Sequence, residues 1–108
     1  MTLLTRPEEL ILLAVLELKE AAYSIPIREY VCRITGENWS LGSIYMPLDR
    51  LVKKGFLESY LSEATPERGG RHKRIYTVTR EGREALIKVR DVAAAAWARN
   101  RGLSPEAE

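Results

Sequence analysis

Hydrophobic residues recur at three- and four-residue spacing along most of the chain, which predicts a mainly helical protein. The first helix is expected to begin at Thr5, because Thr5-Arg6-Pro7-Glu8 has the form of a capping box with proline in the first turn. Between residues 10 and 16 the apolar surface of this helix extends almost all the way round. A helix on a small core needs only one apolar stripe, so the excess predicts a second covered surface, such as that of another subunit.

Two more helices are predicted after the first, joined by a short connection. Ser24 is placed as the N-cap of the second helix, and Gly36 is placed to end it. The third helix is expected to start at residue 42 or 43, with Pro47 near its first turn, and to stop at Gly55. Two helices joined by a short turn are typical of a helix-turn-helix.

The hydrophobic period changes after the third helix. Residues 56–62 and 74–78 alternate as strands do, and the polar segment from Glu63 to Lys73 contains Gly69-Gly70, which predicts a hairpin tip. Helix, helix, helix, hairpin and helix is the element order of a winged helix-turn-helix. The expected fold class is therefore mainly α with a small antiparallel β-hairpin, a plan used mostly to bind duplex DNA.

A last helix is expected from Thr79 to about Arg99. Its apolar positions form a narrow seam of the coiled-coil type, made by Leu86, Val89, Ala93 and either Ala96 or Trp97. Such a seam predicts a C-terminal dimerisation helix. The single domain then divides into a winged helix-turn-helix region at 1–79, the dimerisation helix at 80–101 and a flexible tail at 102–108.

Composition removes several classes of function. The chain has 108 residues, of which 45% are hydrophobic and 30% charged, as expected for one folded domain. Its longest apolar run, Leu10 to Leu16, is far shorter than the roughly 20 residues of a membrane span, and no signal segment is visible, so a cytoplasmic location is expected. The single cysteine, Cys32, and single histidine, His72, make a disulfide, a metal site or a Ser-His-Asp triad improbable. No enzyme activity and no cofactor are expected.

Positive charge is concentrated in the middle of the chain. Residues 1–49 carry four basic and seven acidic side chains, a net charge of −3. Residues 50–83 carry nine basic and four acidic side chains, a net charge of +5, and residues 84–108 carry four of each. An anionic partner is therefore expected to dock on the third helix and the hairpin.

Two separate runs carry a resemblance to a known family. The run from Trp39 to Leu51 is similar to a Gly-Thr/Ser-aliphatic-Tyr-Pro-x-Leu-x-Arg-Leu signature, with Met46 additional between the Tyr and Pro positions. The run from Gly69 to Arg83 is similar to a Gly-Gly-x-x-Arg/Lys-Lys-x-Tyr-x-Leu-Thr-x-x-Gly pattern. Over residues 8–90 the chain resembles the PadR-type transcriptional regulators, in their compact branch with a short C-terminal helix. It departs from them at Ala22-Tyr23, where the family has Gly-Tyr.

The resemblance implies a sequence-specific regulator of transcription that binds double-stranded DNA. It further implies a homodimeric repressor on a palindromic operator, released by a small-molecule signal that changes the separation of the two recognition helices. The alternative is a winged-helix protein-interaction module without specific DNA binding. An acidic or apolar third helix and wing would mark that alternative, and the cations Arg50, Lys53, Arg71, Lys73 and Arg74 argue against it.

DNA contacts are expected on the outer face of the third helix and around the hairpin tip. Ser43 and Met46 are expected to face base edges and Arg50 a phosphate or a guanine, whereas Lys53 either contacts phosphate or serves the helix dipole. The tip is a basic wing in this interpretation and a solvated loop in the alternative one. The predicted DNA-binding residues are Ser40, Ser43, Tyr45, Met46, Arg50, Lys53, Arg68, Arg71, His72, Lys73 and Arg74.

The dimer interface is expected on the first and last helices. The predicted residues are Leu10, Leu13, Leu86, Val89, Ala93, Ala96 and Trp97. An aromatic residue on the last helix lines a small-molecule pocket between subunits in some proteins of the resembled family. Trp97 and Ala93 are therefore candidates for an effector pocket, and the alternative is a Trp97 that only packs in the interface.

Overall fold

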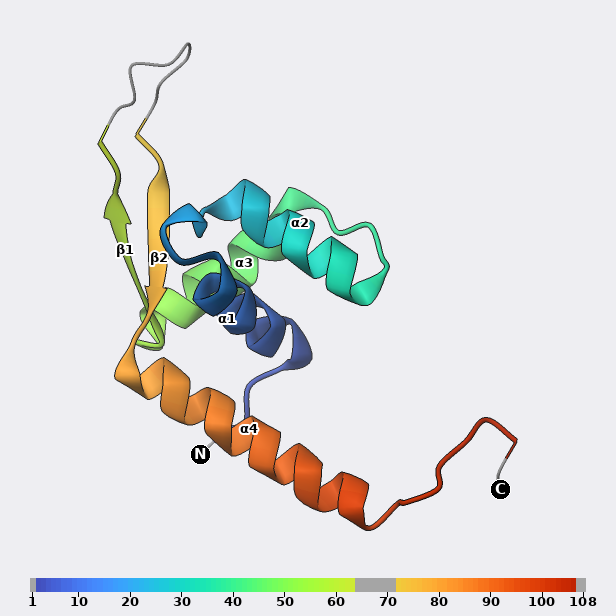
Figure 1. The fold of residues 1–108 in the computed structure, drawn as a ribbon. Coiled ribbons are helices and arrows are strands. Elements are labelled where there is room, and N and C mark those ends of the chain that lie inside the picture. The colour runs from blue at the N-terminus through green and yellow to red at the C-terminus, as the bar shows by residue number, and fades with distance from the viewer. Residues whose placement is uncertain (1, 64–71, 107–108) are drawn as a thin grey trace.

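The computed structural model of the chain describes residues 2–63 and 72–106. Within these residues the elements follow the order that the sequence predicts, so the mainly helical fold with an antiparallel hairpin is confirmed (Figure 1). The elements are α1 (Arg6–Leu18), the 3₁₀ turn η1 (Lys19–Ala21), α2 (Ser24–Thr35), α3 (Leu41–Lys53), β1 (Leu57–Leu61), β2 (Arg74–Val78) and α4 (Arg80–Ala98).

The start of α1 is fixed by the predicted capping box. Thr5 Oγ1 accepts a hydrogen bond from the Glu8 backbone N–H at 3.3 Å, and Glu8 Oε1 accepts one from the Thr5 N–H at 2.8 Å. One face of α1 is fully buried, while Leu13 and Leu16 on another face stay exposed. The unusually broad apolar surface of this helix is therefore only partly covered by its own chain.

The helix-turn-helix differs from the prediction at the start of both helices. Tyr23, not Ser24, is the N-cap of α2, because the Tyr23 carbonyl already accepts the first helical bond, from the Ile27 N–H at 3.1 Å. Ser40 caps α3 by accepting from the Ser43 N–H at 3.1 Å, so α3 begins earlier than expected. Pro47 consequently lies inside α3 rather than near its first turn, and it is buried there.

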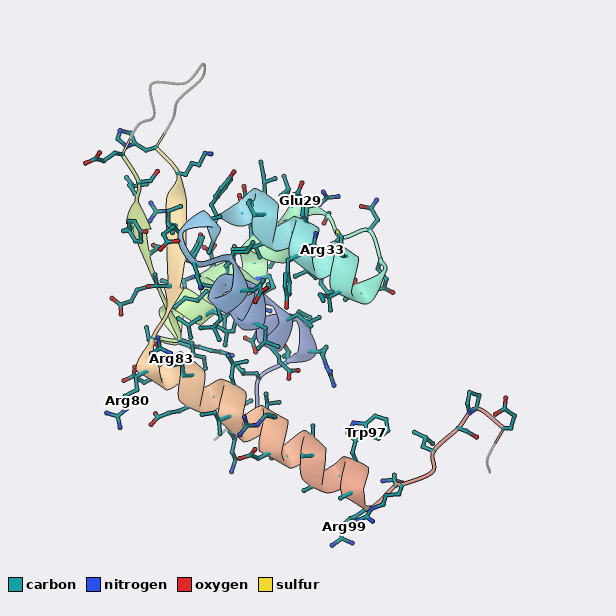
Figure 2. The ribbon with its side chains drawn as sticks, viewed as in Figure 1. Glu29, Arg33, Arg80, Arg83, Trp97 and Arg99 are labelled. Carbon is teal, nitrogen blue, oxygen red and sulfur yellow. The ribbon has the colours of Figure 1, made fainter. Side chains whose placement is uncertain are left out.

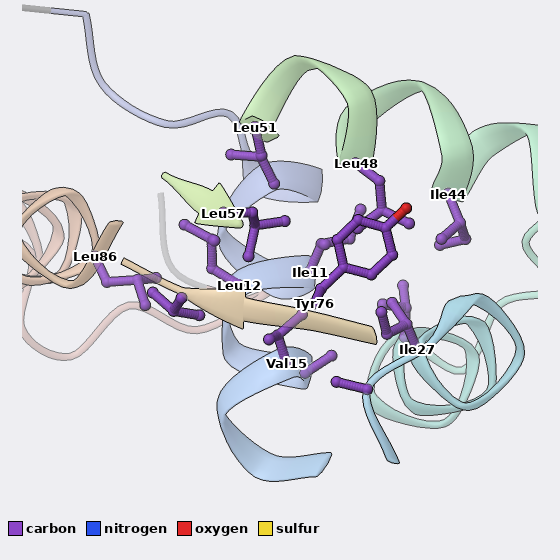
Figure 3. Packing of buried hydrophobic residues seen from close by; sticks show 14 of the residues in the cluster. Ile11, Leu12, Val15, Ile27, Ile44, Leu48, Leu51, Leu57, Tyr76 and Leu86 are labelled. Atoms are coloured by element: carbon purple, nitrogen blue, oxygen red, sulfur yellow. The ribbon is translucent and has the colours of Figure 1, made fainter. Parts of the chain in front are cut away.

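The core lies between α1, α2, α3 and the inner face of the hairpin (Figure 3). It is built from large aliphatic side chains whose helical or strand spacing turns them inward. Figure 3 labels ten of its members: Ile11, Leu12, Val15, Ile27, Ile44, Leu48, Leu51, Leu57, Tyr76 and Leu86.

The two strands pair in antiparallel register from Leu57 opposite Val78 to Leu61 opposite Arg74. The Tyr76 N–H donates to the Ala22 carbonyl at 2.9 Å, so β2 is also joined to the segment that leads into α2. The hairpin is thereby held against the helix-turn-helix along one side (Figure 1).

The start of α4 is hydrogen-bonded to the turn that follows α3. Thr79 caps α4, its N–H donates to the Phe56 carbonyl at 3.1 Å, and its hydroxyl donates to the Gly55 carbonyl at 2.7 Å. Gly82 faces the same turn so closely that a Cβ atom there would lie 2.3 Å from the Phe56 carbonyl oxygen and 2.8 Å from Val78 Cγ1. From this junction α4 runs out past the body of the domain (Figure 1).

Replacing Gly82 with alanine should therefore destabilise the fold. The added methyl would meet backbone atoms rather than a flexible side chain, and such overpacking costs about 2–3 kcal/mol. We expect urea denaturation of Gly82→Ala to show this loss in the free energy of unfolding. The control is Gly42→Ala in α3, where the nearest atom lies 3.9 Å from the added carbon. Equal denaturation midpoints for the two variants would contradict the described junction.

Candidate nucleic-acid interface

The outer face of α3 is exposed as the sequence predicts. Ile44, Leu48 and Leu51 are completely buried on one side of the helix. Met46, on the other side, is 67% exposed, and Ser43 is exposed near it. Among the residues that the structure describes, Lys53 on this face has no acidic partner within ion-pair distance. The face thus offers small polar, thioether and cationic groups to a partner.

Tyr45 connects this face to the start of α2. Its hydroxyl donates to Ser24 Oγ at 3.3 Å, and its ring is 47% exposed. No side chain in the described part of the chain caps the first turn of α2, whose Pro26 also lacks an N–H. The positive end of the α2 dipole therefore lies beside Ser24 and Tyr45, as at helix N-termini that bind phosphate.

The hairpin brings a cation to the same place, from the residue that precedes β2 at the tip end of the two strands. Lys73 Nζ lies 4.4 Å from the ring centroid of Tyr23 and 3.3 Å from its hydroxyl. The backbone at Lys73 is held in turn by Ser62, whose hydroxyl accepts the Lys73 N–H at 3.0 Å. Lys73 is thus directed toward the N-terminus of α2 rather than into solvent alone.

The structure describes two of the other four residues predicted for the wing, His72 and Arg74. His72 Nδ1 lies 2.6 Å from the Ser62 carbonyl oxygen, and Arg74 donates from Nη1 to Ser59 Oγ at 3.0 Å. Arg68 and Arg71, predicted at the tip of the hairpin, lie outside the described residues. The structure therefore brings together the α3 face, Tyr45 and Lys73, with His72 and Arg74 along the hairpin.

Arg50 is turned toward α1. Its Nε lies 3.7 Å from Glu8 Oε2, and Lys54 Nζ lies 2.7 Å from the same oxygen. Glu8 is 1% exposed, while both cations are partly exposed. Burial by itself raises the pKa of the Glu8 carboxyl, but the hydrogen bonds from Lys54 and from the Thr5 N–H, with the charge of Lys54, outweigh it and hold the pKa below the usual 4.5.

Sequence reasoning missed three of these residues. Tyr23 and Ser24 join the helix-turn-helix to the hairpin and to α3, and Glu8 joins α1 to the end of α3. The capping box identifies Glu8 as the first-turn acid of α1, yet only the packing of α3 against α1 buries it. Tyr23 and Lys73 are 50 positions apart, so no local pattern predicts their contact.

The residues predicted to form the dimer interface fall into two groups. Leu86 is buried within the chain's own core, and Leu10 and Val89 pack against that core. Leu13, Ala96 and Trp97 are exposed, with Trp97 at 62%, and Ala93 is half-buried. An apolar groove of about 390 Å³ runs between α1 and α4, lined by Glu9, Leu13, Leu16, Arg83, Leu86, Ile87 and Arg90.

Trp97 lies over a smaller hollow near the end of α4. This hollow has a volume of about 190 Å³ and is lined by Ala96, Trp97, Asn100 and Leu103. Ala93, the second residue predicted for an effector pocket, does not line it. Figure 2 shows the Trp97 side chain standing away from the body of the domain.

The fold and this interface define a winged helix-turn-helix protein with the features of a DNA-binding regulator. The sequence profile of the transcriptional regulator PadR-like family matches residues 12–88, and the chain belongs to that family. This confirms the family that the two sequence runs indicate. A comparison with curated protein sequences finds no match.

Solved structures agree with this assignment. A PadR family transcription regulator from Clostridium difficile R20291 is 28% identical, with a TM-score of 0.66 over 90% of this chain and 98% of that one. The hsRosR-S1 protein, solved as a complex, is 30% identical, with a TM-score of 0.65 over 86% of this chain and 75% of that one. A PadR-like transcription factor from Bacteroides fragilis is 22% identical and shares the fold, with a TM-score of 0.69 over 90% and 88% of the two chains.

The described part of the chain also bears on membrane insertion and on metal binding. No helix in residues 2–63 and 72–106 has the length and apolar character that crossing a bilayer requires. The same residues contain no cluster of three or more histidine, cysteine or acidic side chains arranged to hold a metal ion.

The lowered pKa of Glu8 predicts a pH-dependent contribution to stability. The ionised carboxylate is favoured by the folded state, so its contribution is fully present above the unfolded pKa near 4.5 and is lost as the pH falls through the lower, folded pKa. We expect Glu8→Gln to lower the free energy of unfolding by about 1–2 kcal/mol at pH 7. The difference from wild type should shrink below pH 4.5. Urea denaturation of wild type and Glu8→Gln between pH 7 and pH 3 measures this difference in the free energy of unfolding. A difference that stays constant with pH would contradict the ion pair between Glu8 and Lys54.

Proposed function

We propose that this PadR-like regulator acts as a homodimer that binds a palindromic operator in double-stranded DNA. The observation that carries the proposal is a chain of side-chain contacts that joins α3, through Tyr45 and Ser24, to Tyr23 and Lys73. Three elements that are distant in sequence contribute to it. Such an arrangement suits a DNA backbone that passes from the major groove to the adjacent wing.

Each part of the arrangement has a distinct role in this proposal. Ser43 and Met46 meet base edges in the major groove, and Ser40, Tyr45 and Lys53 contact the flanking backbone. The uncapped start of α2 and Lys73 share a phosphate, since both present positive charge beside Ser24. His72 and Arg74, with Arg68 and Arg71 beyond them, follow the backbone along the wing.

Dimerisation is proposed to join α4 of one subunit to the α1–α4 groove of the other. Each chain leaves an apolar groove bordered by Leu13, Leu16 and Ile87 uncovered, and each has an apolar stripe on the outer half of α4 that includes Ala93 and Trp97. Mutual coverage would bury both. Two recognition helices related by this symmetry would read half-sites about 34 Å apart, one turn of DNA.

Repression and release are further parts of the proposal. A dimer bound across a promoter would exclude the transcription machinery. A small molecule near Trp97 and Ala93 would release it by changing the angle between the two α4 helices, since a shift of a few ångströms breaks register with successive grooves. The exposed Trp97 ring and the hollow beside it support this location.

The DNA-binding part is tested with two matched variants, Lys73→Gln and Lys88→Gln. Selection from a pool of random duplexes identifies the operator, and affinity is then measured against salt for that duplex and a scrambled one. We expect selective binding by wild type, and a salt slope for Lys73→Gln that is flatter by about 0.9, the loss of one phosphate contact. Lys88 lies on α4 away from the hairpin, so Lys88→Gln should behave as wild type. Weak, unselective binding unaffected by Lys73→Gln would favour the protein-interaction alternative.

The dimer is tested by placing the same charge on opposite sides of α4. Ala93 is half-buried on the side that faces the groove, and Ala95 is exposed on the other side. Wild type and Ala95→Asp should show twice the 12.3 kDa chain mass in light scattering at micromolar concentration, and Ala93→Asp should show the monomer mass. A monomeric wild type would contradict the proposed assembly.

A further inference from the structure

One charged side chain belongs to the buried class among the residues that the structure describes, and it is Glu8. Its oxygens have different partners. Oε1 accepts the Thr5 N–H at 2.8 Å and so completes the cap of α1. Oε2 faces α3, with Lys54 Nζ at 2.7 Å and Arg50 Nε at 3.7 Å. A single carboxylate on the first helix therefore faces two cations at the end of α3.

For these cations the Glu8 carboxylate competes directly with DNA phosphate. Both are oxyanions that an ammonium or a guanidinium group binds at hydrogen-bond distance. Glu8 is already desolvated, and removing its cations would leave a buried charge without compensation, which is strongly unfavourable. A phosphate would have to overcome that cost before it could bind either cation. By contrast, Lys53, the neighbouring cation on α3, has no acidic partner among the described residues.

We propose that Glu8 is an internal counter-anion that withholds Arg50 and Lys54 from DNA phosphates and so limits sequence-independent DNA affinity. This inference rests on the proposed DNA-binding function. It assigns Arg50 to the α1–α3 contact in place of the DNA contact that the sequence suggests. Because non-specific binding depends on the number of phosphates neutralised, two withheld cations lower it more than they lower binding to an operator that is read through base edges.

The test compares Glu8→Gln with Glu17→Gln. Both variants remove one negative charge from α1, but Glu17 is exposed near the other end of the helix and has no ion pair with α3. On a scrambled duplex we expect the slope of log K against log salt to steepen by about one to two for Glu8→Gln, because each released cation adds about 0.9. Glu17→Gln should keep the wild-type slope. Denaturation curves confirm that each variant is folded at the assay temperature.

A second comparison excludes a merely structural effect. Replacing both Arg50 and Lys54 with glutamine in wild type should leave the slope unchanged, because the two cations are not engaged by DNA. This variant leaves the Glu8 charge without its cations, so it is assayed at a temperature at which its denaturation curve shows it folded. The same pair of replacements in Glu8→Gln should return the steepened slope to the wild-type value. An unchanged slope in Glu8→Gln, or a flatter slope when Arg50 and Lys54 are replaced in wild type, would overturn the inference.

Failure of the inference can be told apart from failure of the proposed function. A wild-type protein that binds the duplexes while Glu8→Gln keeps its slope rejects only the role of Glu8. If wild type binds no duplex, the proposed function fails. Elution from immobilised heparin, a polyanion without sequence, then still tests the withholding of the two cations. Later elution of Glu8→Gln than of Glu17→Gln supports it, and co-elution rejects it.

Discussion

The architecture depends on the two-residue turn that follows the recognition helix. The carbonyls of Gly55 and Phe56 accept the hydroxyl and the N–H of Thr79, and the missing side chain of Gly82 lets α4 approach that turn. Through this contact the orientation of α4 is set relative to α3. Because α4 has 19 residues and is about 28 Å long, a small tilt at the turn becomes a large displacement at its far end. In the proposed dimer, the separation of the two α3 helices would therefore be sensitive to one turn of each chain.

Helix α1 provides a second connection, between α3 and the groove beside α4. At its start Glu8 binds the end of α3, and further along Leu13 and Leu16 face the groove beside α4. The central face of α1 is buried in the core, so the helix cannot move without disturbing the packing of both neighbours. This explains the broad apolar surface that the sequence shows, since one face of α1 packs in the core and another lines the groove beside α4.

Local signals in the sequence were sufficient for most of the fold. Thr5, Gly36 and Thr79 mark helix ends through interactions within four residues, and these positions agree with the structure. Pro47 lies inside α3 because Ser40 caps the helix through the Ser43 N–H, a local signal that the prediction passed over when it placed Pro47 near the first turn. The contact of Tyr23 with Lys73, by contrast, requires the hairpin to fold back against η1 and α2, which no local pattern encodes.

The distinction between local signals and contacts made by distant elements also applies to charge. Counting side chains assigns residues 50–83 a net charge of +5, which points to the region of the interface but not to its members. In the structure Arg50 and Lys54 face Glu8, and Arg80 lies 3.7 Å from Glu84. The Arg80–Glu84 pair has an i,i+4 spacing that a sequence shows, whereas the pairing of Arg50 and Lys54 with Glu8 joins two helices and follows only from their packing. Because phosphate contacts require available cations, the number of lysines and arginines alone does not fix the strength of a DNA interface. In the role proposed for Glu8, the position of one buried acid decides how many of those cations are available.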